Sequence, residues 1–354
     1  MKFLAGLSLI ASVASAMSVD LTQRGGPLDV KIEVVGNTNV KASITNTGKE
    51  PLKVLKTGSI LDTAAVEKTQ IFSSSGPVAF DGLRLRVAAS HLTEDAFQLI
   101  APGETVSATW DPAEVHDLSA GGSFDLKVSG ALQFADVDSV ELKGTIPFSS
   151  NMITSHSVDG AAASAARHSF HAKWKRSVVQ SDCTSTKGTA TRTALSNCRA
   201  LAAAASQAAS SGAAAKMTEY FKSSTSATRS TVANVFARIA SECGSTTSGV
   251  ARYYCSDVYG ACSSGVLAYT LPSASYMVNC PLYFSALSPL SRTCHAQDQA
   301  TTTLHEVTHL AQIKGTTDQN GCYGYSCVQS LSASQNLNHA DTYALFANAI
   351  YVGC

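Results

Sequence analysis

The stretch that decides the fold is residues 298–318, which read DQATTTLHEVTHLAQIKGTTD. Its centre places His305 and His309 four residues apart, with Glu306 directly after the first histidine. On a helix, residues four apart project from the same face, one turn from each other. Two imidazoles in this arrangement can bind one metal ion, so the pair is a candidate metal site.

The residues around this pair predict a helix from Asp298 to Lys314. Asp298 is of a type that caps helix N-termini, and Gly315 is of the type that follows a helix C-terminus. Leu304 and Val307 fall on one face, as in a helix packed on a core. The alternative is a solvated or core helix that happens to carry two histidines. The pattern arises by chance in roughly one per cent of chains of this length, so it needs support from the rest of the sequence.

The chemistry that this pattern predicts is peptide-bond hydrolysis with one Zn²⁺ per catalytic domain. In such sites two neutral imidazoles and a third protein ligand hold the zinc, and the open position takes a water whose pKa the metal lowers. Glu306 is the candidate general base. It would take the proton of that metal-activated water and pass it to the leaving amine.

The third ligand has two main candidates. Asp318 lies nine residues after His309, a span of roughly 30 Å if extended, and Gly315 allows the chain to turn back. Asp341 is the rival, three residues after Asn338 in a predicted final helix, where the helix dipole already favours a carboxylate. Spacing favours Asp318 by a modest margin. Two further histidines of this half are in no helical register with the pair: His295 and His339.

Residues 1–16 are typical of a secretory signal peptide. Lys2 precedes the apolar run 3–11, and Ala14-Ser15-Ala16 is a small-x-small cleavage site. No later segment approaches the roughly 20 apolar residues that a transmembrane helix needs. The charges are balanced, with 26 Lys and Arg against 26 Asp and Glu, which gives no support to nucleic-acid or membrane-surface binding. We expect a secreted, extracellular protein with neither partner.

The cysteines divide the chain into two halves. All of them lie in the second half: Cys183, Cys198, Cys243, Cys255, Cys262, Cys280, Cys294, Cys322, Cys327 and Cys354. An even set in a secreted chain predicts up to five disulfides, and a cysteine as the last residue suggests a tethered C-terminus. The competing interpretation, a zinc–thiolate cluster, wants C-x-x-C pairs, and the sequence has none.

The cysteine-free half has strand patterns. Residues 28–34 and 124–128 alternate apolar and polar, and Gly- and Asn-rich turns lie between such runs. We expect an all-β, sandwich-like domain. Its five histidines have no metal-ligand spacing and are expected at the surface: His91, His116, His156, His168 and His171.

The junction between the halves contains an Ala-rich run, 160–166, and the dibasic pair Lys175-Arg176. The small residues predict a flexible linker, and the pair is of the kind that processing proteases cut. An ordinary basic surface cluster is the alternative, but the position between the halves favours cleavage. The expected organisation is a signal peptide (1–16), a pro-segment (17–176) and a catalytic domain (177–354).

The second half has mainly helical patterns. Helices are expected at 194–221, 231–243, 298–314 and 338–351, with one hairpin in the Gly- and Ser-rich stretch 255–288. The expected mature domain is mainly α, with a small β element and several disulfides.

HEVTH, followed by Gly315-Thr316-Thr317-Asp318 and then Tyr323-Gly324-Tyr325, resembles the deuterolysin, or aspzincin, family of secreted fungal neutral zinc proteases. The resemblance covers the chain in outline, because that family also has a signal peptide, a long pro-segment, a dibasic junction and a disulfide-bonded helical domain. It implies a zincin-like mature domain. It also implies His305, His309 and Asp318 as zinc ligands and Glu306 as the base.

The family further implies Tyr323 as the phenol that stabilises the oxyanion. Residues 319–322 form a longer spacer than the family pattern, so Tyr325 stays an alternative. Tyr283, after Cys280-Pro281, resembles a second tyrosine needed for activity, and a packed aromatic is the competing interpretation. In this view Asp341 orients a metal ligand or supports the fold and does not bind the metal itself. A disulfide between Cys322 and Cys327 would clamp the spacer.

We therefore expect a secreted, monomeric zinc endopeptidase of broad specificity that acts on proteins or peptides. Residues 18–176 would serve as its inhibitor or chaperone until they are cut off. The family is associated with cutting basic proteins, and Asp341 is the candidate carboxylate for a pocket that would bind a basic side chain. The rival is a secreted, disulfide-rich binding or effector protein with a vestigial HExxH, which would hold no zinc.

Overall fold

The structure, a computed structural model, describes residues 26–171, 179–245 and 249–354. We refer to 26–171 as the N-terminal region and to 179–354 as the C-terminal region. The predicted signal peptide and the pair Lys175-Arg176 lie outside the described residues, so both cleavages stay predictions.

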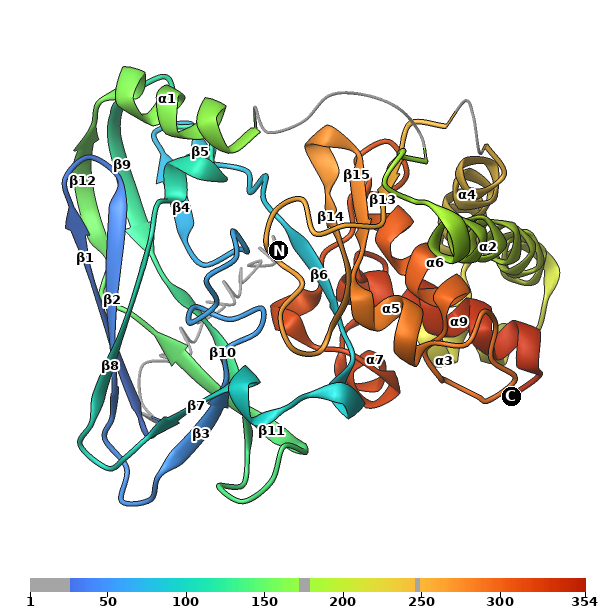
Figure 1. Cartoon of the computed structure of the whole chain (residues 1–354), viewed down its shortest axis with the longest axis horizontal. Helices are drawn as coiled ribbons and strands as arrows, with labels where there is room; N and C mark the ends of the chain where they lie inside the picture. Colours follow the sequence, from blue (N-terminus) through green and yellow to red (C-terminus); the bar gives the residue numbers. More distant parts are fainter. Residues whose placement is uncertain (1–25, 172–178, 246–248) are drawn as a thin grey trace, which may run out of the picture.

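The N-terminal region is built mainly from strands, drawn in blue to green in Figure 1. They are β1 (Leu28–Val35), β2 (Asn39–Asn46), β3 (Leu52–Leu55), β4 (Gln70–Ser73), β5 (Gly76–Pro77), β6 (Arg84–Val87), β7 (Phe97–Ile100), β8 (Thr105–Trp110), β9 (Gly122–Lys127), β10 (Ser129–Ala135), β11 (Leu142–Ser149) and β12 (Ile153–Val158). Most pair into sheets of order β1-β2-β8, β11-β10-β3-β7 and β12-β9-β4-β5. Alternate residues point inward, as Val40, Ala42 and Ile44 of β2 show.

The Ala-rich run is a helix, α1 (Gly160–His171), and the prediction of a flexible linker there is wrong. Alanine has the highest helix propensity, and the Asp159 carboxylate accepts hydrogen bonds from the first free amides, those of Ala161 and Ala162. Ala163 and Phe170 are buried on the inner face. This run has the composition of a linker, but its N-cap and its packing hold it in a helix.

One of the five histidines expected at the surface is buried. His116 is 2% exposed, and its ring packs edge-on to Phe80 at 5.7 Å. Burial lowers its pKa, so the neutral form fits this apolar place. The surface prediction is wrong for His116, because a half-apolar imidazole can fill a core position without leaving a pattern in sequence.

The C-terminal region contains most of the helices, drawn in yellow-green to red in Figure 1. They are α2 (Ser185–Ser211), α3 (Ala214–Phe221), α4 (Ser226–Cys243), α5 (Pro281–Ala286), α6 (Gln299–His309), α7 (Tyr325–Ser330), α8 (Ala333–Asn336) and α9 (Ala340–Val352). Three strands accompany them: β13 (Arg252–Tyr254), β14 (Val266–Leu271) and β15 (Tyr276–Asn279). The predicted hairpin is β14 with β15, which pair antiparallel.

Several helix boundaries differ from the predicted ones. Helix α2 begins at Ser185 rather than at residue 194, and α4 begins at Ser226 rather than at residue 231. The predicted helix 194–221 is interrupted at Gly212, which separates α2 from α3. The helix predicted to run to Lys314 ends at His309, because Leu310 leaves the helical backbone and its carbonyl accepts from both Lys314 N and Gly315 N in a turn. No described helix is both long enough and apolar enough to cross a membrane.

All ten cysteines form disulfides in the C-terminal region. The pairs are Cys183–Cys255, Cys198–Cys243, Cys262–Cys280, Cys294–Cys354 and Cys322–Cys327. The predicted number of disulfides, the tethered C-terminus and the Cys322–Cys327 clamp are therefore confirmed.

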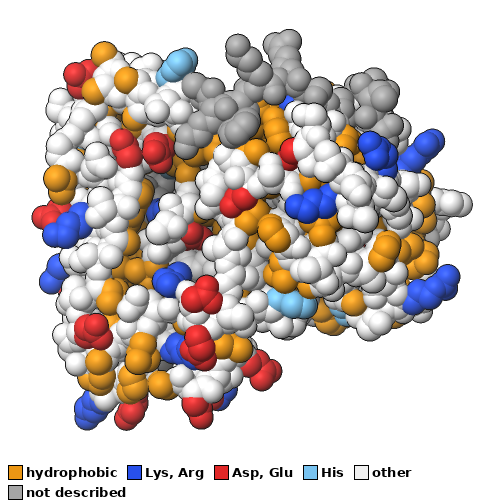
Figure 2. All heavy atoms as spheres, in the orientation of Figure 1, with side chains coloured by type: hydrophobic (Ala, Val, Ile, Leu, Met, Phe, Trp, Pro, Cys, Tyr) orange, Lys and Arg blue, Asp and Glu red, His pale blue; other side chains and the backbone are white. Residues whose placement is uncertain are grey.

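One sheet joins the two regions. Its order is β13-β15-β14-β6, so one of its two outer strands, β6, comes from the N-terminal region. β6 pairs antiparallel with β14, and Leu85 lies opposite Tyr269. Figure 1 shows β6, in cyan, beside the orange strands β14 and β15. On the face drawn in Figure 2, acidic and basic side chains are interspersed.

Breaking the two disulfides of residues 294–354 should have unequal effects. The Cys294–Cys354 bond closes a separation of 60 residues and the Cys322–Cys327 bond one of five. Loop-closure entropy predicts that paired Ser substitutions lower the free energy of unfolding by about 4 and about 2 kcal/mol respectively. Urea unfolding followed by circular dichroism measures both. A larger loss at Cys322 and Cys327 would contradict the entropic explanation.

Candidate metal centre

Helix α6 carries the candidate metal ligands through the core of the C-terminal region. It begins with a capping box, in which the Asp298 side chain accepts from Thr301 N and the Thr301 hydroxyl accepts from Asp298 N. All eleven residues of α6 are buried, which is unusual for a helix this polar and requires partners for its side chains. The site is therefore enclosed by the fold rather than added to its surface.

Three ligand-type atoms converge at the end of α6. His305 Nε2 lies 3.2 Å from His309 Nε2 and 3.2 Å from Asp318 Oδ1, and His309 Nε2 lies 3.6 Å from that same carboxylate oxygen. Two atoms bound tetrahedrally to zinc at about 2.05 Å lie about 3.3 Å apart. The three residues thus fit a zinc ion in separation and in donor chemistry. Asp318 Oδ1 is buried without a well-aligned hydrogen bond among the described residues, as expected of a metal-facing oxygen.

The outer nitrogens of both histidines face groups that can fix the tautomer. His309 Nδ1 donates to the Thr316 carbonyl at 2.9 Å, which leaves Nε2 free to bind metal. His305 Nδ1 lies 3.5 Å from Asp341 Oδ1 and 3.2 Å from Arg86 Nη1. A guanidinium cannot accept a hydrogen bond, so only Asp341 could accept from His305 when the proton is on Nδ1, the tautomer that leaves Nε2 for a metal. Arg86 itself donates to Asp341.

The turn after α6 places Asp318. Gly315 has a φ of +67°, a left-handed conformation that side chains other than glycine strain to adopt. The Thr308 and Thr316 hydroxyls are 2.6 Å apart, which ties the turn to the helix. Thr317 then pairs with the segment before α9, donating its N–H to the Asn338 carbonyl at 2.9 Å.

The charges of this cluster influence one another. Burial lowers the pKa of His309 to about 3, which favours the neutral imidazole that metals bind. Burial would raise the pKa of Asp318, but the neighbouring His309 and His305 outweigh it and hold that pKa well below its usual range. A carboxylate and two imidazoles therefore face one point.

Glu306 is held from the neighbouring strand β14. Its Oε2 accepts a hydrogen bond from the Thr270 hydroxyl at 2.6 Å, whereas its Oε1 is buried with no partner among the described residues. Burial raises the pKa of Glu306 to about 7. One oxygen is thus fixed and the other is available for a proton.

The three candidate tyrosines lie in different places. The Tyr323 ring is 6.2 Å from the His305 ring, and its hydroxyl donates to the Leu85 carbonyl at 2.6 Å. Burial raises the Tyr323 pKa far above the ordinary value, so the phenol stays a donor. Tyr325 instead stacks on His295, and its hydroxyl donates to Glu219.

Tyr283 lies at the beginning of α6 rather than at its end. It is fully buried, and its hydroxyl donates to the Gln299 carbonyl and lies 3.1 Å from the Thr303 hydroxyl. These contacts are those of a packed aromatic that supports the helix. A catalytic role for Tyr283 stays a prediction.

The other histidines of the C-terminal region have other partners. His295 binds the Tyr220 hydroxyl at 2.6 Å, and His339 faces the Cys322 carbonyl at 3.0 Å. His295 is also close to Cys294 and Cys354, but these sulfurs are bonded to each other and are not thiolate ligands.

Sequence reasoning missed three residues of this centre. They are Thr270, which holds Glu306, and Leu85 and Arg86, which reach the site from the N-terminal region. Thr270 sits in an apolar strand run, and Arg86 is 219 residues from His305, so no local spacing connects them to the motif.

Comparisons with known proteins give matches over the whole chain. The Deuterolysin metalloprotease (M35) family matches residues 1–354. A neutral protease 2 homolog of Colletotrichum graminicola is 58% identical over 355 residues, and one of Phaeosphaeria nodorum is 56% identical over 358 residues. One of Aspergillus oryzae is 43% identical over 357 residues. In all three, the alignment covers 100% of both chains.

The loss of zinc affinity on substitution should distinguish which of the two carboxylates, Asp318 or Asp341, binds the metal. Asp318→Asn removes the candidate third ligand and should weaken zinc binding more than Asp341→Asn. The latter removes the carboxylate that faces His305 Nδ1 and should cost about 10- to 100-fold. Competition with a calibrated chelator measures both, and circular dichroism checks that each variant is folded. A larger loss with Asp341→Asn would show that Asp341 is the ligand.

Proposed function

Because the chain belongs to the deuterolysin metalloprotease (M35) family and is therefore a metalloendopeptidase, we propose that it is a secreted zinc enzyme made as an inactive precursor. The observation that carries the proposal is the convergence of His305, His309 and Asp318 at one point. Its substrates are proteins or peptides. A preference for basic proteins belongs to the proposal.

His305, His309 and Asp318 would hold the metal through their converging nitrogens and carboxylate oxygen. Zinc, when bound there, supplies a Lewis acid that lowers the pKa of water and polarises a carbonyl. Asp341 and the Thr316 carbonyl keep the two imidazoles oriented.

Glu306 is proposed to move the proton. Thr270 holds one of its oxygens, and the unpartnered Oε1 accepts the proton of the attacking water. The same carboxyl then delivers that proton to the leaving amine. Rigid support from β14 keeps the reactive oxygen aimed without reorganisation.

Tyr323 is proposed to stabilise the developing oxyanion, and the hydrogen bond that its phenol already donates to a peptide carbonyl supports this role. Tyr325 is a weaker candidate because its hydroxyl is bound to Glu219. Tyr283 is proposed to support α6 rather than the chemistry.

The domain organisation is also a proposal. Residues 1–16 are a signal peptide, 17–176 a sandwich-like pro-segment and 177–354 a mainly α, zincin-like catalytic domain. The strand-rich N-terminal region, the helical C-terminal region and the cysteines confined to the latter support this division. The pro-segment acts as the inhibitor, and secretion follows from the signal peptide.

Glu306→Gln should remove activity but not zinc. Glutamine keeps the shape of the side chain and its contact with Thr270 but cannot accept a proton, so kcat should fall about 10²- to 10⁴-fold. The chain cleaved after Arg176 and loaded with zinc is assayed on denatured casein, with zinc content measured in parallel. An undiminished kcat would exclude Glu306 as the base.

Tyr323→Phe should lower kcat about 10²- to 10³-fold with little change in KM, because the phenol acts mainly on the transition state. Tyr325→Phe is the matched control, since it removes the same hydroxyl two residues away. If Tyr325→Phe had the larger effect on kcat, Tyr325 would replace Tyr323 as the phenol that stabilises the oxyanion.

A further inference from the structure

One outer strand of the sheet β13-β15-β14-β6 belongs to the N-terminal region. β6 pairs antiparallel with β14 over Arg84 to Val87, and Ala88 N donates to the Gly265 carbonyl at 2.7 Å. On its other side β14 pairs with β15. Without β6, β14 would present a free edge, which is the kind of surface to which extended peptides add.

This edge lies directly beside the proposed catalytic groups. Thr270 of β14 holds Glu306 and pairs in register with Arg84 of β6. A strand on this edge therefore passes over the side of α6 that carries Glu306. An extended peptide that added to this edge would take the same path.

The Leu85 carbonyl contacts one of the proposed catalytic groups. It accepts the 2.6 Å hydrogen bond from Tyr323, the phenol proposed above to bind the oxyanion. The Leu85 side chain is 3% exposed and packs in a cluster that includes Tyr269. Residue 85 is thus held both by its backbone and by its side chain.

Arg86 occupies a closed, charged pocket. It is 1% exposed and donates to Asp341, which is itself buried and accepts from Gly324 N with its second oxygen. The Arg86 guanidinium also lies over the Tyr323 ring, 5.8 Å from its centroid. Removing the arginine would leave the Asp341 charge buried and unpaired.

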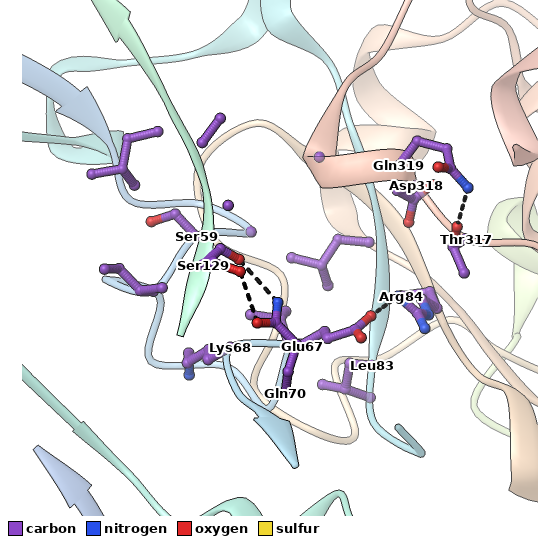
Figure 3. A pocket seen from close by; sticks show the side chains of 18 of the residues that line it. Ser59, Glu67, Lys68, Gln70, Leu83, Arg84, Ser129, Thr317, Asp318 and Gln319 are labelled. Atoms are coloured by element: carbon purple, nitrogen blue, oxygen red, sulfur yellow. Dashed lines mark hydrogen bonds and ion pairs between the residues drawn. The ribbon is translucent and has the colours of Figure 1, made fainter. Parts of the chain in front are cut away.

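The space around β6 is enclosed by both regions. A cavity of about 290 Å³ is lined by Asp318, Gln319 and Tyr323 from one region and by Glu67 and Arg84 from the other. Figure 3 shows Asp318 and Gln319 on the same side of the cavity as Arg84, which pairs with Glu67. The Asp318 carboxylate therefore lies beside a cavity that the N-terminal region helps to enclose.

We propose that Arg84–Val87 inhibits the precursor by occupying the substrate cleft in the manner of a substrate. Leu85 stands where the residue that contributes the cleaved carbonyl would lie, and Arg86 fills the pocket for the residue that follows it. This inference rests on the proposed function and specifies how the inhibitory region reaches the site.

The test uses the full, zinc-loaded chain with Lys175→Ala and Arg176→Ala, so that the junction is not cut. Arg86→Met keeps the aliphatic stem and removes the charge. Arg167→Met is the matched control, because Arg167 is a partly buried arginine whose ion pair, with Asp81, lies within the N-terminal region. The readouts are hydrolysis of a short fluorogenic peptide, binding of a peptide hydroxamate by calorimetry, and hydrogen exchange of Val266–Leu271.

Arg86→Met should raise peptide turnover and hydroxamate affinity by roughly 30-fold or more over the parent, the factor expected for losing one buried charge pair. Exchange in β14 should rise with them, and Arg167→Met should match the parent in all three. Equal values for parent and Arg86→Met would overturn the inference, provided that the parent cut after Arg176 digests casein. A chain that binds no zinc would remove the proposed function and this inference together.

Discussion

The hydrogen bonds between the end of α6 and the turn at Gly315 determine where Asp318, the proposed third metal ligand, lies. Thr316 is bound to the helix through its N–H and hydroxyl, which contact Thr308, and through its carbonyl, which accepts from His309. The left-handed Gly315 lets the chain reverse within a few residues. As a result Asp318 meets the two imidazoles at zinc-ligand distances. The same contacts that end the helix also orient a ligand.

Burial strengthens the hydrogen bonds and charge interactions of this centre, because little water competes with them. The centre lies within the core of the C-terminal region, where each polar group needs a partner and each charge changes its neighbours. Glu306 has one oxygen held by Thr270 and one left free, an arrangement that a general base can use. The strand that supplies Thr270 also pairs with β6, so the proposed catalysis and the proposed inhibition depend on one sheet edge.

Local patterns predicted the parts of this molecule whose causes are local. Helical spacing predicts that His305 and His309 share one face, and the turn that Gly315 allows makes Asp318 a candidate to join them. The even number of cysteines predicts the number of disulfides. Position 116 and the Ala-rich helix α1 were misjudged, because packing against distant residues decides both. Arg86 could not be found at all, since its contact with Asp341 spans 255 residues and depends on strand register.

X-ray absorption at the zinc edge of the zinc-loaded chain tests the central claim most directly. If His305, His309 and Asp318 hold the metal, the first shell contains two imidazoles and only oxygen otherwise, at about 2.0–2.1 Å. Because all ten cysteines are in disulfides, no sulfur is expected. A shell with sulfur at about 2.3 Å, or one with a single imidazole, would contradict the proposed centre.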